Sequence, residues 1–226
     1  MNLWIKICGN TSFEDANLAA EAGADAVGFV FAPSPRQVTA RQVSKIIPRL
    51  PEAVEKIGVF VDATTEEIET TVRESRLSGV QLHFDAHQDL PARLRARFGR
   101  KLRILRVWHY QANAAAAVAA LAKDTNLDAV LLDSRTATAV GGTGIPFDWN
   151  RASSELQYSG TNRRLIVAGG LTPANVSDAI QKFHPWGVDV VSGVESAPGI
   201  KDVDKVRAFI AKARAASGTG KQEESR

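Results

Sequence analysis

The 226-residue sequence has little of what several classes of protein require. It contains one cysteine, Cys8, which excludes an internal disulfide framework and a multi-cysteine zinc site. No stretch approaches the roughly 18 consecutive apolar residues that a membrane helix needs. The four histidines show no metal-ligand spacing. We therefore expect no metal, no cofactor and no membrane partner, and the single thiol fits a cytoplasmic location.

The excess of one sign of charge is also small. The net charge is +3, from 28 basic and 25 acidic residues, which is too mild to predict nucleic-acid binding. A basic cluster between Arg93 and Arg106 lacks the interleaved aromatic residues of a single-strand-binding surface, so we expect a solvated face there. The first apolar run contains Lys6, so we expect no signal-peptide core in residues 1–10. The weak positive charge does suit a small anionic ligand.

One pattern repeats along the chain: a short run rich in Val, Ile, Leu and Phe, followed by a longer segment of helical period. There are eight such runs, at residues 4–8, 26–31, 56–61, 79–83, 102–107, 128–133, 164–168 and 187–192. Near-continuous apolar strands that alternate with helices predict a parallel sheet covered by helices. Eight units in this length predict a single-domain (β/α)8 TIM barrel over residues 1–216. Residues 217–226 are predicted to form a disordered tail.

An open, doubly wound sheet is the alternative fold. Gly9 stands alone after the first run, without the glycine fingerprint that would predict a dinucleotide-binding loop there.

Several residues predict where helices begin and end. Three capping-box patterns, a Thr-Pro start and two terminal glycines are present: Thr11 with Glu14, Thr39 with Gln42, Thr64 with Glu67, Thr172 with Pro173, Gly23, and Gly99.

In such a barrel, the active site forms where the strands end and the following loops begin. Cys8 ends the first run and shares a face with Lys6 and Trp4, because side chains alternate along a strand. Asp133 ends the sixth run. A thiolate and a carboxylic acid on opposite rims can serve one substrate as general base and general acid. The plainer alternatives are a small buried hydrophobe for Cys8 and a helix cap or salt bridge for Asp133.

Glycine-bearing loops follow the last three strands. Glycine lets the backbone approach a ligand, and exposed amides at such turns bind anions. We therefore predict a phosphate site in this quarter of the barrel. The alternative is that these glycines only form tight turns. The predicted phosphate-binding residues are Gly142, Gly144, Gly169, Gly170, Ser192 and Gly193. Segment 134–146 is long enough to be a candidate lid.

Two further strand-end residues are candidates for substrate binding. Arg36 follows two prolines, and a guanidinium on so stiff a loop suits a carboxylate or phosphate. A surface arginine is the plainer interpretation. His83 ends the fourth run, and histidine is the side chain that can change its charge near neutral pH, but a hydrogen-bonded structural histidine is an equal alternative.

The ordered strand ends resemble those of the phosphoribosylanthranilate isomerase family of tryptophan biosynthesis. The resemblance runs from about residue 4 to residue 199 and is specific because the motifs occur in order. The motifs are KICG (Lys6–Gly9), GFVF (Gly28–Phe31), SPR (Ser34–Arg36), GVFV (Gly58–Val61), QLH (Gln81–His83), LD (Leu132–Asp133), GGTG (Gly141–Gly144), FDW (Phe147–Trp149), AGGL (Ala168–Leu171) and SGVE (Ser192–Glu195).

The resemblance implies a cofactor-free Amadori rearrangement of N-(5-phosphoribosyl)anthranilate to a 1-deoxyribulose 5-phosphate. It implies Cys8 as general base, Asp133 as general acid, Arg36 on the anthranilate carboxylate and the late glycine loops on the phosphate. Asp133 must then carry a proton when substrate binds, and Cys8 must ionise, which nearby positive charge promotes. Gly9 is expected to leave room for substrate. The partner is a small phosphorylated molecule, and the chain is expected to be a monomer or a homodimer.

One position departs from the family pattern: Phe84 stands where glycine usually follows the histidine. A related barrel isomerase of histidine biosynthesis does the same rearrangement with a pair of aspartates, and dual-substrate relatives use aspartate at the end of the first strand. Cys8 at this strand end argues against both. Indole-glycerol-phosphate synthase uses lysines at strand ends, whereas Lys6 lies inside the first strand. The alternative from another class is a phosphosugar-binding barrel without catalysis.

Overall fold

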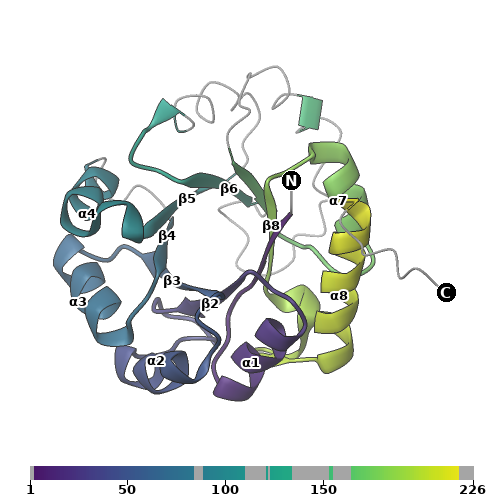
Figure 1. The fold of residues 1–226 in the computed structure, drawn as a ribbon, viewed down its shortest axis with the longest axis horizontal. Coiled ribbons are helices and arrows are strands. Elements are labelled where there is room, and N and C mark those ends of the chain that lie inside the picture. The colour runs from purple at the N-terminus through teal and green to yellow at the C-terminus, as the bar shows by residue number, and fades with distance from the viewer. Residues whose placement is uncertain are drawn as a thin grey trace.

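The computed structural model describes residues 3–83, 89–109, 121, 123–133, 153–154 and 164–218. Eight parallel strands close into a barrel (Figure 1). They are β1 Trp4–Ile7, β2 Ala26–Val30, β3 Glu55–Val61, β4 Gly79–His83, β5 Arg103–His109, β6 Ala129–Asp133, β7 Leu165–Ala168 and β8 Gly187–Val190. The predicted (β/α)8 barrel is confirmed, and each predicted apolar run coincides with one strand.

Pairing between the first and last strands closes the ring. Strand β1 pairs in parallel with β2 on one side and with β8 on the other, so that Lys6 lies opposite Ala26 and Asp189. Because every strand runs in the same direction, all the carboxyl ends meet at one end of the barrel. That end collects the residues on which the predicted site depends.

A ring of helices surrounds the strands (Figure 1). Within the described residues these are α1 Phe13–Glu21, α2 Ala40–Ile46, α3 Thr65–Ser75, α4 Leu90–Phe98, α7 Val176–Phe183 and α8 Val203–Ala216, with short 3-10 turns at Ile47–Arg49, Gly99–Lys101 and Ser192–Val194. Their apolar faces pack on the outward side chains of the strands, including Ile5, Phe29 and Val188. In the described part of the chain, no helix is long and apolar enough to cross a membrane.

Most of the predicted helix boundaries are confirmed. Thr39 with Gln42 and Thr64 with Glu67 each form a complete capping box. Gly23 and Gly99 follow α1 and α4 with φ of 98° and 61°, a region of backbone conformation that favours glycine.

Two predicted starts are wrong. Ser12, not Thr11, caps α1, because the Thr11 hydroxyl donates to the Gly199 carbonyl at 2.7 Å. Helix α7 begins at Val176 rather than at Pro173. The Thr172 side chain instead accepts from the Ala174 amide in a turn that precedes the helix.

The inward side chains change character along the barrel. The amino-terminal half is filled by apolar residues, among them Trp4, Ile57, Leu105, Leu131 and Ile166. Farther along, the inward positions become polar: β1 and the residue after it give Trp4, Lys6 and Cys8, and β6 gives Ala129, Leu131 and Asp133. The barrel thus has an apolar floor and a polar mouth.

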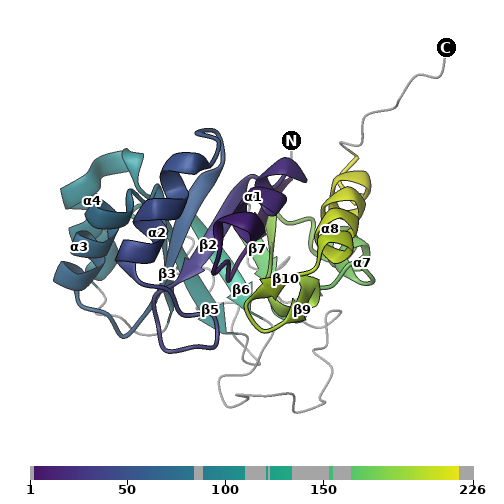
Figure 2. The ribbon, with the colours of Figure 1, turned by 90° about the horizontal axis from the view of Figure 1, so that it is seen from below.

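A small antiparallel hairpin follows β8 and was not predicted. It consists of β9 Glu195–Ala197 and β10 Ile200–Lys201. Figure 2 shows it beside the lower end of the barrel in that view, next to the start of α8. The hairpin places Glu195 and Lys201 close to the end of β1, where both contact predicted site residues.

Candidate active site

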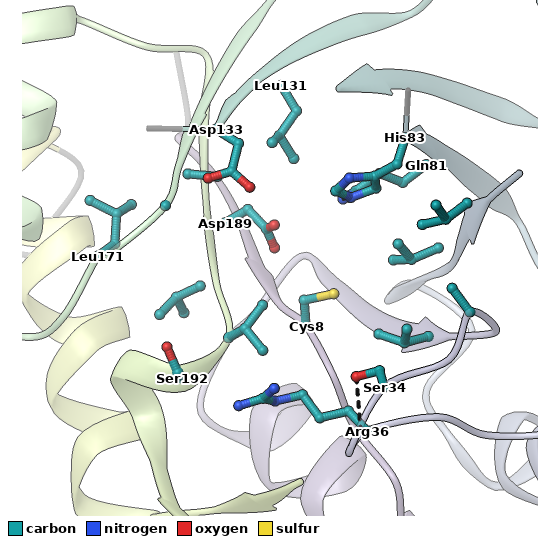
Figure 3. Close-up of a pocket in the computed structure, with 18 of the residues that line it drawn as sticks. Cys8, Ser34, Arg36, Gln81, His83, Leu131, Asp133, Leu171, Asp189 and Ser192 are labelled. Carbon is teal, nitrogen blue, oxygen red and sulfur yellow. Dashed lines mark hydrogen bonds between the residues drawn. The ribbon is translucent and has the colours of Figure 1, made fainter. Parts of the chain in front are cut away.

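A pocket opens at the carboxyl ends of the strands (Figure 3). Eight of the ten predicted site residues line it: Cys8, Arg36, His83, Asp133, Gly169, Gly170, Ser192 and Gly193. The other two, Gly142 and Gly144, lie outside the described residues, as do segment 134–146 and Phe84. The structure therefore brings together residues that are up to 185 positions apart, from Cys8 to Gly193.

Cys8 and Asp133 enter this pocket from different strands. Cys8 follows β1 and its amide donates to the Val190 carbonyl at 2.8 Å, while Asp133 is the last residue of β6. Both are almost completely buried, with 2% of each residue exposed. In Figure 3 the thiol and the carboxylate point into the same cavity, with Asp189 drawn between them. A substrate in the pocket can contact both groups.

Charged neighbours act on the Cys8 thiol in opposite directions. Burial raises its pKa above the ordinary value, and the Asp189 carboxylate adds to this effect. The Lys6 and Lys201 ammonium groups lower the pKa of Cys8, but not enough to offset burial. Positive charge that promotes ionisation of Cys8 is therefore present, in Lys6 and Lys201, neither of which was predicted to have this effect.

Lys6, Gln81 and Asp189 form a polar layer beneath Cys8. Lys6 is fully buried, and its Nζ donates to Gln81 Oε1 at 2.7 Å and to Asp189 Oδ1 at 2.9 Å. Gln81 and Asp189 line the pocket as well. None of the three was predicted as a site residue. A usable signal existed, because each is a polar residue at an inward position of an otherwise apolar strand.

Arg36 reaches the pocket from the loop after β2. Its amide donates to Ser34 Oγ at 3.1 Å, and its guanidinium binds Glu195 through two hydrogen bonds, Nε to Oε1 at 2.8 Å and Nη2 to Oε2 at 2.5 Å. Glu195 also accepts from Lys201 Nζ at 3.1 Å. Neither Glu195 nor Lys201 was predicted, because only the hairpin brings them to β1.

Gly9 makes room for Arg36. Its φ is 75°, and a Cβ there would lie 2.8 Å from Arg36 Cδ and 3.0 Å from Val191 Cγ1. The space where a Gly9 side chain would lie thus holds the arginine side chain, and the expectation that Gly9 leaves room for substrate stays a prediction.

His83 contacts the polar layer from the end of β4. The Gln81 and His83 Nε2 atoms are 3.1 Å apart. Because Gln81 Oε1 accepts from Lys6, the Gln81 amide nitrogen faces the ring and donates to it. A neutral His83 then accepts at Nε2 and carries its proton on Nδ1. His83 also packs against the His109 ring at a centroid distance of 5.8 Å.

Two glycine-bearing loops meet at the predicted phosphate site. Gly169 and Gly170 have φ of 81° and 67°. Asn175 holds their loop by accepting from the Thr172 amide at 2.7 Å and donating to the Gly170 carbonyl at 3.0 Å. A Cβ on Gly193 would lie 1.8 Å from the Leu171 carbonyl oxygen. The loops after β7 and β8 therefore touch through their backbones, an arrangement that only glycine permits.

No metal centre is evident in the part of the chain that the structure describes. There, no group of three or more His, Cys, Asp or Glu side chains is placed to hold an ion. The prediction that the chain needs no metal and no cofactor stays a prediction.

Known proteins resemble this chain over nearly its full length. The family described as PRAI, N-(5'phosphoribosyl)anthranilate (PRA) isomerase, matches residues 5–212. The N-(5'-phosphoribosyl)anthranilate isomerase of Trichlorobacter lovleyi is 41% identical to this chain, and the match covers 94% of this chain and 98% of that protein. The isomerase of the same name from Magnetococcus marinus is 43% identical, and the match covers 96% of this chain and 97% of that protein.

Solved structures agree with these relatives. The phosphoribosyl anthranilate isomerase of Thermotoga maritima superposes with a TM-score of 0.83 at 34% identity, covering 94% of this chain and 99% of that one. A phosphoribosyl anthranilate isomerase in complex with reduced 1-(o-carboxyphenylamino)-1-deoxyribulose 5-phosphate has a TM-score of 0.79 at 34% identity, with the same two coverages. Together with the barrel and its pocket, these similarities show that the chain belongs to the N-(5'-phosphoribosyl)anthranilate isomerase family.

Proposed function

We propose that the chain converts N-(5'-phosphoribosyl)anthranilate to 1-(2-carboxyphenylamino)-1-deoxyribulose 5-phosphate, a step of tryptophan biosynthesis, with Cys8 as general base and Asp133 as general acid. The observation that carries the proposal is the shared pocket. A thiol and a carboxyl group converge there, beside an arginine and two glycine-bearing loops, Gly169–Gly170 and Ser192–Gly193. These groups match the parts of a substrate that bears one carboxylate and one phosphate.

The chemistry assigns one proton transfer to each group. Asp133 protonates the furanose ring oxygen, so the C1–O bond breaks and the nitrogen lone pair forms an iminium. The iminium acidifies the C2 hydrogen, which the Cys8 thiolate removes to give an enolamine. The enolamine then gains a proton at C1 and loses the one on its 2-hydroxyl, which leaves the ketone. No oxidant or reductant is consumed.

The binding groups have separate assignments. Arg36 holds the anthranilate carboxylate, because a guanidinium recognises a planar carboxylate through parallel hydrogen bonds. The backbones at Gly169, Gly170, Ser192 and Gly193 hold the phosphate. His83 lines the pocket at the end of β4 and is assigned to the substrate-binding wall. We assign Gly142 and Gly144 to phosphate binding by their sequence motif alone.

The test is turnover of N-(5'-phosphoribosyl)anthranilate by the purified chain and its variants. Cys8→Ala and Asp133→Asn are each expected to lower kcat by roughly two orders of magnitude or more, the usual scale for acid–base groups. Circular dichroism and thermal unfolding serve as the control for folding. Near-normal turnover by either variant contradicts its assignment, and binding without turnover by the parent chain identifies a phosphosugar-binding barrel instead.

Two further expectations belong to this proposal. Dialysis against a chelator should leave turnover unchanged, because neither proton transfer needs a metal. Sedimentation or gel filtration should find a monomer or a homodimer. One solved neighbour is described as mutually generated monomers of the dimeric isomerase from Thermotoga maritima.

A further inference from the structure

A lysine side chain lies wholly inside the barrel, directly below the proposed base. None of Lys6 is exposed. A buried ammonium is costly unless it is paired and its hydrogen bonds are satisfied. Asp189 supplies the counter-charge at 2.9 Å, and Gln81 supplies a second acceptor at 2.7 Å from the opposite side of the barrel. Burial alone would lower the pKa of Lys6, but Asp189 and Cys8 outweigh it, so Lys6 stays cationic.

The Lys6 and Cys8 side chains occupy the same space above β2. A Cβ added at Gly28 would lie 2.5 Å from Cys8 Sγ and 2.9 Å from Lys6 Cε. Both side chains therefore use the gap that the missing Gly28 side chain leaves. An ammonium group has three hydrogen-bond donors, of which Gln81 and Asp189 take two. The third is available to Cys8 Sγ, which shares the gap beside Gly28 with Lys6 Cε.

We infer that Lys6 is a positioning residue for the isomerase reaction: its ammonium, aimed by Asp189 and Gln81, is the counter-ion of the Cys8 thiolate. The inference rests on the proposed role of Cys8 as the base. Cys8 gives its proton to solvent, the thiolate pairs with Lys6, and the C2 proton of the substrate then reforms the neutral thiol. Lys6 keeps its three protons throughout, so it changes the population of thiolate and transfers nothing.

Asp189 has two opposed effects on this arrangement. It fixes the ammonium in place, but its own negative charge disfavours a thiolate nearby. The remaining charged or titratable groups around Cys8 are Lys201 of β10, whose Nζ donates to the Cys8 carbonyl at 2.6 Å, together with Arg36, His83 and Asp133 in the pocket wall. Lys6 is the largest favourable electrostatic contribution to the thiolate among the residues described.

The experiment measures the thiol pKa directly, because Cys8 is the only cysteine in the chain. The rate of alkylation by iodoacetamide is followed against pH in the parent, in Asp189→Asn and in Lys6→Met with Asp189→Asn. The paired substitution avoids leaving an unpaired buried carboxylate, so the comparison of single with double variant isolates Lys6. Lys56→Met is the matched control, since Lys56 is a buried lysine whose Nζ donates to the Pro51 and Glu52 carbonyls, at 2.7 and 3.3 Å.

The expected result is a lower thiol pKa in Asp189→Asn than in the parent, and a higher one in the double variant. Alkylation near neutral pH should be about tenfold slower in the double variant than in Asp189→Asn, which corresponds to one unit of pKa. Lys56→Met should match the parent. Equal thiol pKa values in the single and double variants overturn the inference, whatever happens to turnover.

The pH dependence of kcat/KM separates this inference from the proposed function. If the pKa that describes the loss of kcat/KM at acid pH moves together with the thiol pKa, the result supports both the role of Lys6 and the role of Cys8 as general base. If the thiol pKa moves and the pKa of the kcat/KM profile does not, Lys6 controls the thiol as inferred, but Cys8 is not the base.

Discussion

Arg36 and Glu195, 159 positions apart in sequence, join the loop after β2 to the hairpin after β8 through two parallel hydrogen bonds. Glu195 is nearly inaccessible, with 4% of its side chain exposed, whereas Arg36 keeps 20% exposed towards the pocket. The carboxylate thus holds one edge of the guanidinium and sets the direction in which Arg36 meets a ligand. Lys201, whose side chain is fully buried, places a second cation on Glu195, at the same oxygen, Oε1, that accepts from Arg36 Nε.

Glu195→Gln should weaken substrate binding more than it slows turnover. A glutamine removes the charge-assisted pairing that orients Arg36, a loss of roughly 1–2 kcal/mol or about tenfold in KM. Steady-state kinetics with N-(5'-phosphoribosyl)anthranilate measures the effect. Arg36→Ala should raise KM at least as much. In the Arg36→Ala background, Glu195→Gln should raise KM little further, because the two residues act as one unit. An unchanged KM in both single variants would show that Arg36 does not bind the substrate carboxylate.

The same carboxylate should make stability depend on acid pH. Burial raises the pKa of Glu195, but the Arg36 and Lys201 cations outweigh it and hold the pKa below its usual range. The contribution of Glu195 to stability is then complete above the unfolded-state pKa, about 4.3, and is lost as pH falls through the lower folded-state pKa. Denaturant unfolding of the parent and of Glu195→Gln should therefore show a constant difference from pH ~7 to ~5 and a shrinking one below. A difference that stays constant in acid would assign the effect to packing.

The barrel was predictable because its determinants are local. A strand buried on both faces must be apolar along its length, so eight apolar runs predicted eight strands, and β4 coincides with its predicted bounds. The errors occur where a side chain has a distant partner. Thr11 has the spacing of a capping residue, yet its hydroxyl donates to Gly199, from a turn 188 positions away. Sequence spacing cannot foresee such a competitor.

The site was predictable only at the ends of strands. Cys8, His83 and Asp133 could be placed there because the fold class fixes where a barrel enzyme builds its pocket. The pairing of Arg36 with Glu195 could not, because it depends on a short hairpin with no apolar run of its own. Lys6 was visible as a charge inside a buried strand, but its partners come from β4 and β8, and nothing in the linear sequence joins those positions.

Gly28→Ala should impair turnover while leaving the fold intact. Its methyl group would press on Cys8 Sγ and Lys6 Cε, at 2.5 and 2.9 Å before relaxation, so the thiol and the ammonium must separate or tilt. We expect kcat to fall by about tenfold or more, since small displacements of a reacting group cost that much. Stability should decrease by about 1–3 kcal/mol, the usual cost of overpacking.

Gly58→Ala is the matched control for that substitution. Gly58 lies on the neighbouring strand β3, where a methyl group would meet Leu77 Cδ1 at 2.6 Å and Phe60 Cε2 at 2.8 Å, away from the thiol. It should cost similar stability and leave kcat close to that of the parent. If the two variants lose kcat equally, the loss reflects general strain in the barrel and not the geometry of Cys8.

Gly193→Ala tests whether the contact between the last two loops forms the phosphate site. The added methyl group would lie 1.8 Å from the Leu171 carbonyl oxygen, and backbone cannot yield as a side chain does, so the loops must move apart. Amides that converge on one anion then lose their alignment. KM for the phosphorylated substrate and the inhibition constant of inorganic phosphate should both rise by about tenfold, equivalent to 1.4 kcal/mol. Gly170→Ala, where a Cβ would meet nothing within 4 Å although φ is 67°, should change both constants less. Unchanged phosphate inhibition in Gly193→Ala would place the anion elsewhere in the pocket.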